Sequence, residues 1–460
     1  MIVENTSAEH ICTLVEKQRQ YFRSEATLKY KFRIGQLERL QKALRKWHKP
    51  LCDALWADLH KSEQEAVLTE LSIVEGEVKN HIRHLKGWMR GKKCSTPLKM
   101  MPSKSYVISE PLGLSLIIAP WNYPVQLLLN PLVGAISAGC AAVVKPSPYV
   151  PTVSQVLADM IADTFDEEYV AAVQGNRDVN KMLLEQRWDI IFFTGSPALG
   201  RVVMEAASKH LTPVVLELGG KSPCVVDKGA DVKIAARRIA WGKCLNAGQT
   251  CIAPDFVWIH SSLKEAFVEQ FAKAIRRMYG DDIRSSRHFV RLVNDRAFER
   301  VAGYMKCGEV LYGGEVDAAE RFIEPTLLGV DGWESAVMQE EIFGPVLPVL
   351  CFDDVEDVVR ELHQREKPLA MYYFGREERG EKFMRRTTSG GACINDTIMH
   401  IANENLPFGG VGNSGMGAYH GRLSFDVFSH RRAVVVTPRR FDIPFRYMPY
   451  KLFKLIKHFL

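Results

Sequence analysis

The first ninety residues carry apolar side chains at the spacing of an amphipathic helix. Leu37, Leu40 and Leu44 recur every three or four positions with charged residues between them, and the pattern continues to about residue 90. Thr6 and Glu9 have the spacing of a capping box just before the first apolar positions. We therefore expect a helical N-terminal region whose first helix begins next to Thr6.

From Leu114 onward the chain changes to short apolar runs separated by stretches of helix length. Such runs, bounded by turn residues, are typical of buried strands. Helix-like stretches such as Val153 to Thr164 lie between them. Strands that alternate with helices predict a parallel, doubly wound sheet covered on both faces. The predicted strands are Leu114 to Ile118, Ala141 to Val144, Val170 to Val173 and Ile190 to Phe193.

A second α/β segment runs from about Gly220 to Thr388, with predicted helices over Asp231 to Leu245 and Leu263 to Met278. Two strand-like runs flank these blocks, Ser103 to Ser109 and Arg432 to Thr437. We expect these two runs to form a small extra sheet or an arm. The pattern predicts two large α/β domains, which a length of 460 residues also favours.

The composition is that of a globular protein with little net charge. The 60 basic and 54 acidic residues leave a net charge of +6 without a long basic block, so nucleic acid is not an expected partner. Ten cysteines lie scattered without a C-x-x-C pair, which indicates a reducing compartment, and no metal site is predicted. The N-terminus does not resemble a signal peptide, and no uncharged run is long enough to span a bilayer. We expect a cytoplasmic protein.

Cys251 lies in the segment Asn246-Ala247-Gly248-Gln249-Thr250-Cys251, just before the strand-like run Phe256 to His260. Small residues crowd the cysteine, so a substrate carbonyl could approach its sulfur. A thiolate is the strongest nucleophile that a side chain offers near neutral pH, provided that its surroundings lower the thiol pKa. The alternative is that Cys251 is a small buried apolar residue, as we assume for the other nine cysteines.

The segment Gly248 to Cys251 resembles the active-site segment of the aldehyde dehydrogenase superfamily. Three other stretches resemble this family in the expected order, namely Pro120 to Pro124, Leu216 to Lys221 and Glu341 to Pro345. The run Asn405 to Gly417 is most similar to the class 3 branch, which handles fatty and aromatic aldehydes. The likeness spans roughly residues 10 to 450, and it implies NAD(P)-dependent oxidation of aldehydes to acids.

The resemblance assigns the catalytic chemistry to a few residues. Attack on an aldehyde puts negative charge on its oxygen, and the implied donors are the Asn122 amide and the backbone N–H of Cys251. Asn122 alone could equally be a turn residue between two prolines. Glu217 is the implied base that activates water against a thioester, and its apolar frame should raise its pKa. Glu341 is a competing candidate for the base, and Tyr123 is assigned to the substrate site.

The phosphates of the cofactor are expected where a strand leads into a helix. The one match to G-x-G-x-x-G, Gly410 to Gly415, lies near the end of the chain after Leu406 to Phe408, outside a βαβ unit. We interpret this run as a glycine-rich loop beside the catalytic pocket. Gly195 and Ser196 instead follow a predicted strand and precede a predicted helix, whose N-terminus favours a phosphate.

The resemblance assigns three further residues to the cofactor. Lys145 would contact the adenosine ribose, and Glu341 would hold the nicotinamide ribose with Phe343 packed beside it. Their alternative roles are a strand-end lysine, a surface acid and a core aromatic residue. The family commonly has a glutamate three residues after this lysine, where this chain has Pro148. Proline neither accepts hydrogen bonds from the ribose nor repels a 2′-phosphate, so we expect NAD or NADP, with NADP well tolerated.

The resemblance also implies how the chain divides. Residues 1–96 and 112–218 would form the dinucleotide-binding domain, 219–390 the catalytic domain, and 97–111 with 391–440 an oligomerisation arm of a homodimer. Residues 441–460 form a predicted amphipathic tail, because Lys451, Lys454 and His458 share one helical face. We expect this tail to cap the molecule or to lie near the substrate entrance. The alternative is peripheral contact with a membrane surface.

Three other functions are compatible with these residues. A cysteine-dependent esterase or thioesterase would use Cys251 and Glu217 without a dinucleotide, and a coenzyme A-acylating dehydrogenase would pass the acyl group to a thiol. A non-catalytic binding protein could keep the same fold. Because Cys251, Glu217 and Asn122 occur together, the sequence favours oxidation of medium- or long-chain or aromatic aldehydes with water as acceptor.

Overall fold

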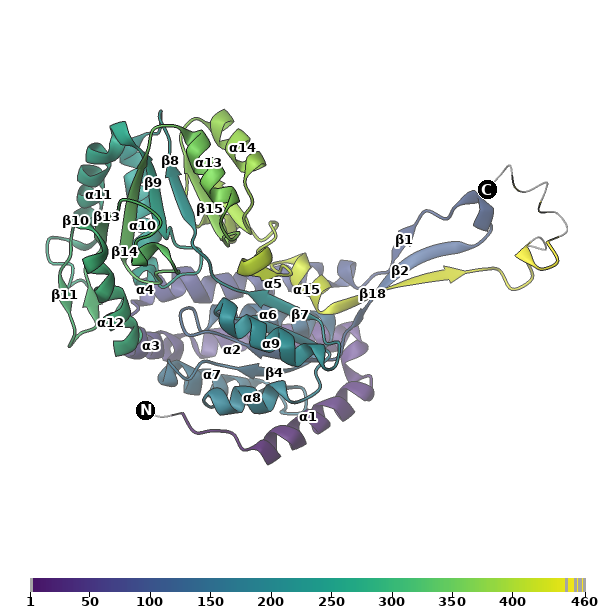
Figure 1. Cartoon of the computed structure of the whole chain (residues 1–460). Coiled ribbons are helices and arrows are strands. Elements are labelled where there is room, and N and C mark those ends of the chain that lie inside the picture. The colour runs from purple at the N-terminus through teal and green to yellow at the C-terminus, as the bar shows by residue number, and fades with distance from the viewer. Residues whose placement is uncertain (1–2, 443–445, 451–452, 454–456, 458–460) are drawn as a thin grey trace.

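The protein consists of two α/β lobes and a β-sheet arm that projects away from them (Figure 1). The computed structural model describes residues 3–442, 446–450, 453 and 457. The chain passes from the sheet of the first lobe to that of the second between Glu217 and Pro223. Both large sheets are mainly parallel, which confirms the predicted α/β fold.

The sheet of the first lobe has six strands among the described residues, in the order β17-β7-β6-β3-β4-β5. Neighbouring strands are parallel except for β17, which is antiparallel to β7. The four strands predicted in this region are confirmed, each to within one residue at its ends. The strands are β3 (Leu114–Ile118), β4 (Ala141–Lys145), β5 (Val170–Ala172), β6 (Ile190–Thr194), β7 (Val214–Glu217) and β17 (Gly415–Met416).

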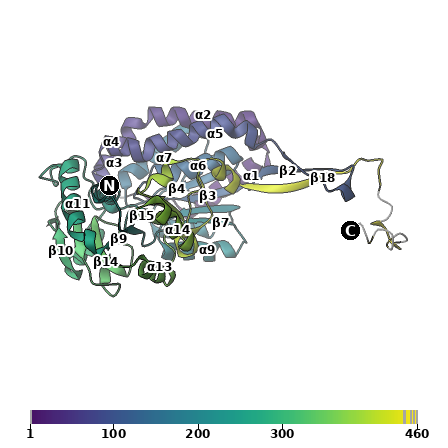
Figure 2. The ribbon, with the colours of Figure 1, turned by 90° about the horizontal axis from the view of Figure 1, so that it is seen from above.

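Helices cover both faces of this sheet because successive strand side chains point to opposite faces. Leu114 and Leu116 of β3 pack with side chains of α1 (Ala8–Arg23), α8 (Arg177–Leu184) and α9 (Pro197–Ser208). Ile117 lies in the core on the other face. That face is covered by α6 (Gln126–Ala138) and α7 (Pro151–Thr164), with α2 (Tyr30–Lys46) and α5 (Ser72–Trp88) side by side over α6 (Figure 2).

The sheet of the second lobe has seven strands among the described residues, in the order β10-β13-β14-β9-β8-β15-β16. Only β10 is antiparallel to its neighbour. The strands are β8 (Pro223–Val226), β9 (Phe256–His260), β10 (Glu309–Tyr312), β13 (Thr326–Gly329), β14 (Val346–Phe352), β15 (Ala370–Phe374) and β16 (Gly391–Ile394). The helices are α10 (Val232–Cys244), α11 (Lys264–Tyr279), α12 (Asp295–Gly303), α13 (Val355–His363) and α14 (Glu377–Arg386), and the first two confirm the predicted helices of this region.

The N-terminal region is helical as predicted, but the predicted helix start is wrong by one residue. The cap of α1 is Ser7, whose hydroxyl accepts from the N–H of His10 at 3.2 Å. Thr6 cannot serve as cap because its hydroxyl accepts from the N–H of Gln174 at 3.2 Å. Helices α3 (His48–Leu59), α4 (Glu63–Ala66) and the π-helical segment η2 (Val67–Leu71) then lead into α5.

The arm is a three-stranded antiparallel sheet of β1 (Lys92–Cys94), β2 (Lys104–Pro111) and β18 (Ser429–Val436), in the order β1-β2-β18. The two strand-like flanking runs are therefore confirmed. The predicted arm boundaries, 97–111 and 391–440, need correction. Strand β1 precedes them, and residues 391–416 contribute β16 and β17 to the two large sheets because these strands pair with β15 and β7. Helix α15 (Arg422–Val427) leads into β18.

The predicted amphipathic tail stays a prediction, since residues 451–452, 454–456 and 458–460 lie outside the described residues. Within the part of the chain that the structure describes, no helix is both long enough and apolar enough to cross a membrane.

Candidate active site

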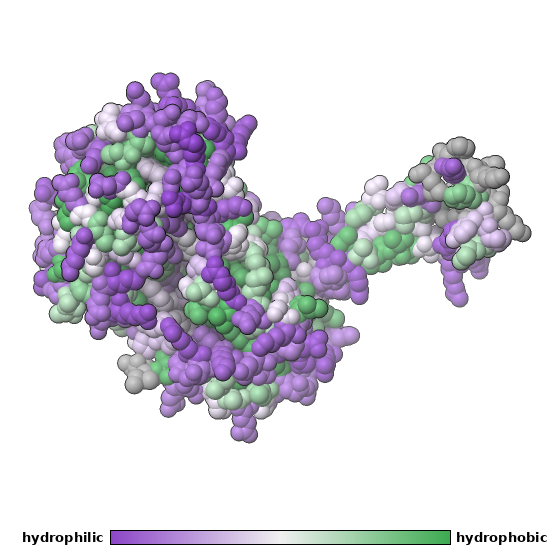
Figure 3. All heavy atoms as spheres, in the orientation of Figure 1, coloured by the Kyte–Doolittle hydropathy of each residue, from purple (hydrophilic) through white to green (hydrophobic). Residues whose placement is uncertain are grey.

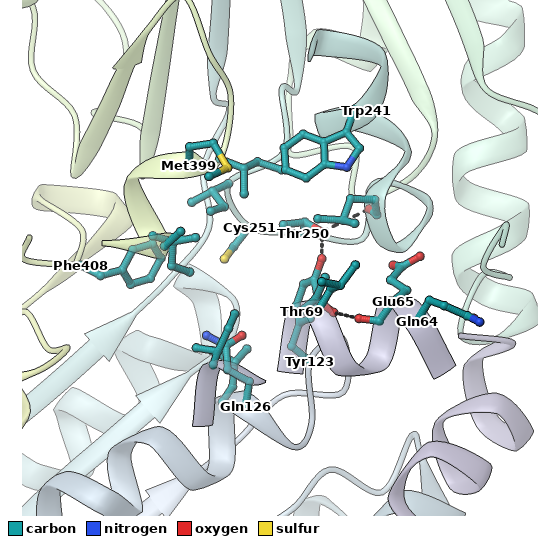
Figure 4. A pocket seen from close by; sticks show the side chains of 18 of the residues that line it. Gln64, Glu65, Thr69, Tyr123, Gln126, Trp241, Thr250, Cys251, Met399 and Phe408 are labelled. Carbon is teal, nitrogen blue, oxygen red and sulfur yellow. Dashed lines mark hydrogen bonds between the residues drawn. The ribbon is translucent and has the colours of Figure 1, made fainter. Parts of the chain in front are cut away.

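A cavity of about 540 Å³ lies between the two lobes and contains the thiol of Cys251 (Figure 4). Helical segments α4, η2 and α6 of the first lobe line one side, and α10, α11 and the loop of Cys251 line the other. Its wall is mainly apolar, which suits an alkyl or aryl ligand. The apolar lining residues are Leu68, Ile73, Tyr123, Leu127, Trp241, Leu245, Ile252, Met278, Tyr279, Ile398, Met399, Ile401, Ala402 and Phe408.

Cys251 lies in the connection from α10 to β9, and its sulfur points into the cavity between Phe408 and Tyr123 (Figure 4). Burial raises the pKa of the thiol, and the nearby carboxyl groups of Glu341 and Glu217 raise it further. The backbone N–H groups of Cys251 and Ile252 act in the opposite direction. The thiol is therefore accessible to a ligand in the cavity but is predominantly protonated near neutral pH.

The loop before Cys251 has an unusual backbone. Asn246 and Ala247 have φ angles of 52° and 51°, in the left-handed region that asparagine tolerates better than alanine. Gly248 follows with a φ of 74°, and a Cβ there would overlap the carbonyl oxygen of Gly344. The loop of the nucleophile thus packs directly against the segment Glu341 to Pro345. Both segments are among the stretches whose sequence resembles the aldehyde dehydrogenase superfamily.

Asn122 is buried and bonded to the same loop. Its side-chain amide donates to the backbone carbonyl of Gln249 at 3.0 Å. Its backbone carbonyl accepts from the side-chain amide of Asn246 at 2.9 Å. An amide nitrogen carries two hydrogens, and the bond to Gln249 uses one of them. The loop after β3 and the loop before Cys251 are therefore joined through both the side chain and the backbone of Asn122.

Tyr123 lines the cavity, and its hydroxyl lies 2.6 Å from that of Thr250. Burial raises the pKa of the Tyr123 phenol well above 10, so it stays neutral. Thr250 was not among the predicted site residues, although it adjoins the nucleophile in the sequence. Trp241 and Met278 were also missed, because apolar residues on a helix look the same whether they face a core or a cavity.

Glu217 ends β7 and lines the cavity with Cys251. Its side chain is 2% exposed, and neither carboxyl oxygen has a hydrogen-bond partner among the described residues. Burial raises the pKa of Glu217 well above its ordinary value. The glycine-rich run lies beside it, as predicted, since Gly415 of β17 pairs with Glu217.

Glu341 is held by backbone contacts. It accepts from the N–H of Gly220, and a Cβ at Gly219 would overlap its carboxyl group. Burial raises the pKa of Glu341 to about 8, with the charge of Asp255 adding to the effect. The lack of a side chain at Gly219 therefore lets this carboxyl group approach the backbone closely enough to accept from Gly220.

Asp255 and Lys221 fix the loop that carries Glu341, and neither was among the predicted site residues. Asp255 accepts from the N–H of Ile342 at 3.0 Å and from Lys221 Nζ at 2.6 Å. Lys221 Nζ also donates to the carbonyls of Val337 and Glu340. Because Asp255 lies only four residues after Cys251, it couples the position of the Glu341 loop to that of the nucleophile.

The predicted phosphate-binding segment lies at the carboxyl edge of the first sheet, where ligands of parallel α/β sheets bind. Lys145 and Phe193 are both register partners of Ile118, so the ends of β4 and β6 lie level with each other on either side of β3. Ser196 caps α9 by accepting from Leu199, and the N–H of Gly195 donates to the carbonyl of Glu217 at 3.0 Å. This arrangement brings the predicted phosphate site next to the predicted base.

The other predicted cofactor residues also fit a dinucleotide. Lys145 is buried, its ammonium donates to the carbonyl of Pro146 at 2.9 Å, and burial lowers its pKa to about 8. A buried ammonium without a carboxylate in contact is suited to ribose hydroxyls or a phosphate. Phe343 has a φ of 51° and packs edge-on against Trp121 at a centroid distance of 5.4 Å.

Comparison with known proteins agrees with this geometry. The model of the aldehyde dehydrogenase family matches residues 1–434. The chain is 42% identical over 443 residues to the 4,4'-diaponeurosporen-aldehyde dehydrogenase of Staphylococcus aureus (strain NCTC 8325 / PS 47), covering 95% of this chain and 96% of that protein. It is 44% identical over 451 residues to the dimeric NADP-preferring aldehyde dehydrogenase of Canis lupus familiaris, covering 97% and 99%.

Solved structures lead to the same family. The substrate-bound state of Staphylococcus aureus AldH superposes with a TM-score of 0.96 at 41% identity, covering 98% of this chain and 99% of that one. The resemblance seen in the sequence is therefore confirmed, and an esterase or thioesterase is not favoured. The chain belongs to the aldehyde dehydrogenase family and is an NAD(P)-dependent enzyme that oxidises aldehydes to carboxylic acids.

Proposed function

We propose that the protein oxidises medium- or long-chain aliphatic and aromatic aldehydes through the thiol of Cys251. This proposal rests on one observation: a single apolar cavity contains both this thiol and the carboxyl group of Glu217, whose oxygens have no hydrogen-bond partner among the described residues. Burial of an alkyl or aryl chain there removes apolar surface from water, worth about 25 cal/mol per Å². A charged aldehyde would lose its hydration without compensation.

The first chemical step begins when the Cys251 thiol releases its proton to water, and the resulting thiolate sulfur adds to the aldehyde carbon. A carbon–sulfur bond forms, the carbonyl π electrons move to oxygen, and a thiohemiacetal anion results. The second hydrogen of the Asn122 amide and the backbone N–H of Cys251 stabilise that anion as donors held in advance. When bound, oxidised NAD(P) supplies the hydride acceptor, and Lys145, Gly195, Ser196, Glu341 and Phe343 would hold it.

The second step is hydrolysis of the thioester that remains on Cys251. A water molecule attacks the acyl carbon, its proton passes to a carboxylate, and the carbon–sulfur bond breaks to release the acid. We assign the carboxylate to Glu217, because this residue lines the same cavity as the thiol and both of its oxygens are free to receive a water. Glu341 is the weaker candidate, because its carboxyl group packs against Gly219 and already accepts a hydrogen bond from the N–H of Gly220.

The two glutamates predict different kinetics. Glu217→Gln should lower kcat by about 10²–10⁴ and keep a rapid first turnover of NAD(P)H, because only hydrolysis loses its base. Glu341→Gln should raise KM for the cofactor without a burst. Burial raises the pKa values of Cys251 and Glu217, so their ionised fractions, and kcat of the unmodified enzyme, should rise with pH. Stopped-flow absorbance at 340 nm measures both phases, and a burst confined to Glu341→Gln would reverse the assignment.

The apolar cavity predicts a dependence on chain length. With saturating cofactor, kcat/KM should increase from two-carbon to eight- or ten-carbon aldehydes, by up to about 0.8 kcal/mol, or fourfold, per buried CH₂. Trp241→Ala should flatten this increase, whereas Val310→Ala, at an exposed position of β10, should leave it unchanged. A steady-state panel of aldehydes provides the measurement. Equal kcat/KM values for short and long chains would contradict the proposed substrate class.

We propose that NADP serves at least as well as NAD. Pro148 follows the buried Lys145 at the position where the family commonly has a glutamate. The absence of a carboxylate at this position removes repulsion of a 2′-phosphate, and the buried ammonium nearby favours an anion. The name of the Canis lupus familiaris relative, which calls that enzyme NADP-preferring, supports the proposal.

Pro148→Glu should shift this preference toward NAD. We expect kcat/KM with NADP to fall at least tenfold while the value with NAD changes less than threefold. Pro148→Ala is the control, since it removes the ring without adding a charge, and it should keep the original ratio. The prediction fails if the unmodified enzyme prefers NAD by more than about a hundredfold, roughly 2.7 kcal/mol, or if both variants shift the ratio equally.

We further propose that the arm joins two copies of the chain in a homodimer in the cytoplasm. Strand β18 pairs with β2 on one side, and its other edge has no partner strand among the described residues. Hydrophobic side chains lie along the arm (Figure 3), including Val435 and Val436, which are 49% and 48% exposed. The relative from Canis lupus familiaris is named as dimeric. All ten cysteines are free, as a reducing compartment requires.

The proposed homodimer and its cytoplasmic location can both be tested on one preparation of the enzyme from lysed cells. We expect the enzyme in the soluble fraction of lysed cells, with a mass by light scattering of about twice 52.0 kDa. Val435→Lys should weaken the dimer, and Val310→Lys, at a similarly exposed valine of β10, should not. Co-sedimentation with liposomes tests the tail, since a chain ending at residue 446 should lose any membrane binding. A monomer, or dissociation by Val310→Lys alone, would contradict the assignment to the arm.

A further inference from the structure

The first lobe contains a fully buried ion pair that the catalytic scheme does not use. Lys61 Nζ lies 2.7 Å from Glu70 Oε1, and both side chains are 0% exposed. Lys61 follows α3, and Glu70 lies in the π-helical segment η2. Desolvation of two charges is costly unless further hydrogen bonds complete the pair, and single turns of π-helix are frequent at functional sites. The other hydrogen-bond partners of Lys61 and Glu70 therefore indicate what this buried pair does.

Both charged groups bind the backbone around Asn122. Glu70 Oε2 accepts from the N–H of Val125 at 2.8 Å and from that of Gln126 at 3.2 Å. Helix α6 starts there, and its cap residue Val125 has no side-chain acceptor, so Glu70 supplies the cap from another helix. Lys61 Nζ donates to the carbonyl of Asn122 at 3.1 Å and lies 4.3 Å from the centre of the Tyr123 ring.

The same short helical segment also reaches the nucleophile loop. Glu65, which lines the cavity near Tyr123 (Figure 4), accepts from the N–H of Asn246 at 2.7 Å. Residues 63–71 thus bind the loop before Cys251 through Glu65 and the loop that carries Asn122 through Glu70. Neither Lys61 nor Glu70 lines the cavity, so both act on the reaction through other groups.

We propose that Lys61 and Glu70 are positioning residues that fix the Asn122 amide against the thiol of Cys251. The ion pair holds the carbonyl of Asn122 and the backbone that follows it into α6, and the bond from Asn122 to Gln249 transmits this position to the nucleophile loop. This inference rests on the proposed role of Asn122 as donor to the anion. A misplaced donor would weaken stabilisation of the transition state but would leave the apolar binding of the aldehyde unchanged.

A double-mutant cycle between Glu70 and Asn122 tests the proposal. Asn122→Ala should lower kcat by about 10²–10³, as loss of one anion donor does. Glu70→Gln should lower kcat at least tenfold in the unmodified chain, but less than twofold in the Asn122→Ala background, with KM for the aldehyde within threefold throughout. If Glu70→Gln does not fold, Glu70→Asp, which keeps the charge but withdraws the carboxylate, takes its place with the same expected pattern.

Arg33→Met is the matched control for loss of a buried charge. Arg33 is 3% exposed and donates to the carbonyls of Thr27 and Ser137, outside the set of residues that line the cavity. It should lower Tm and leave kcat within twofold. A merely structural ion pair would lower kcat by the same factor in both Asn122 backgrounds, or would lower Tm alone, and either result overturns the inference. A normal kcat for Asn122→Ala would instead refute the proposed role of Asn122, and the inference with it.

Discussion

The active site depends on hydrogen bonds between two loops that belong to different lobes. Asn122 follows a strand of the first sheet, and Gln249 lies in the connection that enters the second. The amide of Asn122 donates to the carbonyl of Gln249, and the amide of Asn246 donates back to the carbonyl of Asn122. Each acceptor also has a second buried donor, because Asn246 donates to the carbonyl of Gln249 and Lys61 to that of Asn122, so loss of one bond leaves the two loops joined by the others. The hydrogen bonds that join the two lobes here therefore also fix the position of Cys251 relative to Asn122.

Burial has two opposite consequences for the chemistry. It surrounds the reacting groups with apolar side chains of low dielectric constant, which strengthens every hydrogen bond to a developing anion. It also raises the pKa values of Cys251 and Glu217, so that both groups hold their protons near neutral pH. A thiol and a carboxyl group of this kind are stronger bases once ionised than the same groups in water. The lowered pKa of Lys145 has the same origin.

Much of the fold was predictable from the sequence, because buried parallel strands are continuous apolar runs. Strand β3 was predicted with the observed bounds, and its neighbours to within one residue. Boundaries that depend on pairing were less predictable, since β17 joins a sheet whose other strands lie far earlier in the sequence, and β16 is a short strand that pairs with β15. The candidate site was recognised from family motifs. Lys61 and Glu70 were missed because charged residues in a helical region look solvated, and the sequence does not reveal the π-helical turn that buries Glu70.

The central claim is that the substrate is bound covalently to Cys251 during turnover. Acid quenching of the Glu217→Gln variant, in which hydrolysis of the thioester is slow, during turnover of NADP and a long-chain aldehyde, followed by mass spectrometry of the digested protein, tests it most directly. We predict an acyl group on the peptide that contains Cys251, formed no more slowly than the first equivalent of NADPH. An unmodified Cys251 during steady-state turnover, or an acyl group on another of the ten cysteines, would contradict the account.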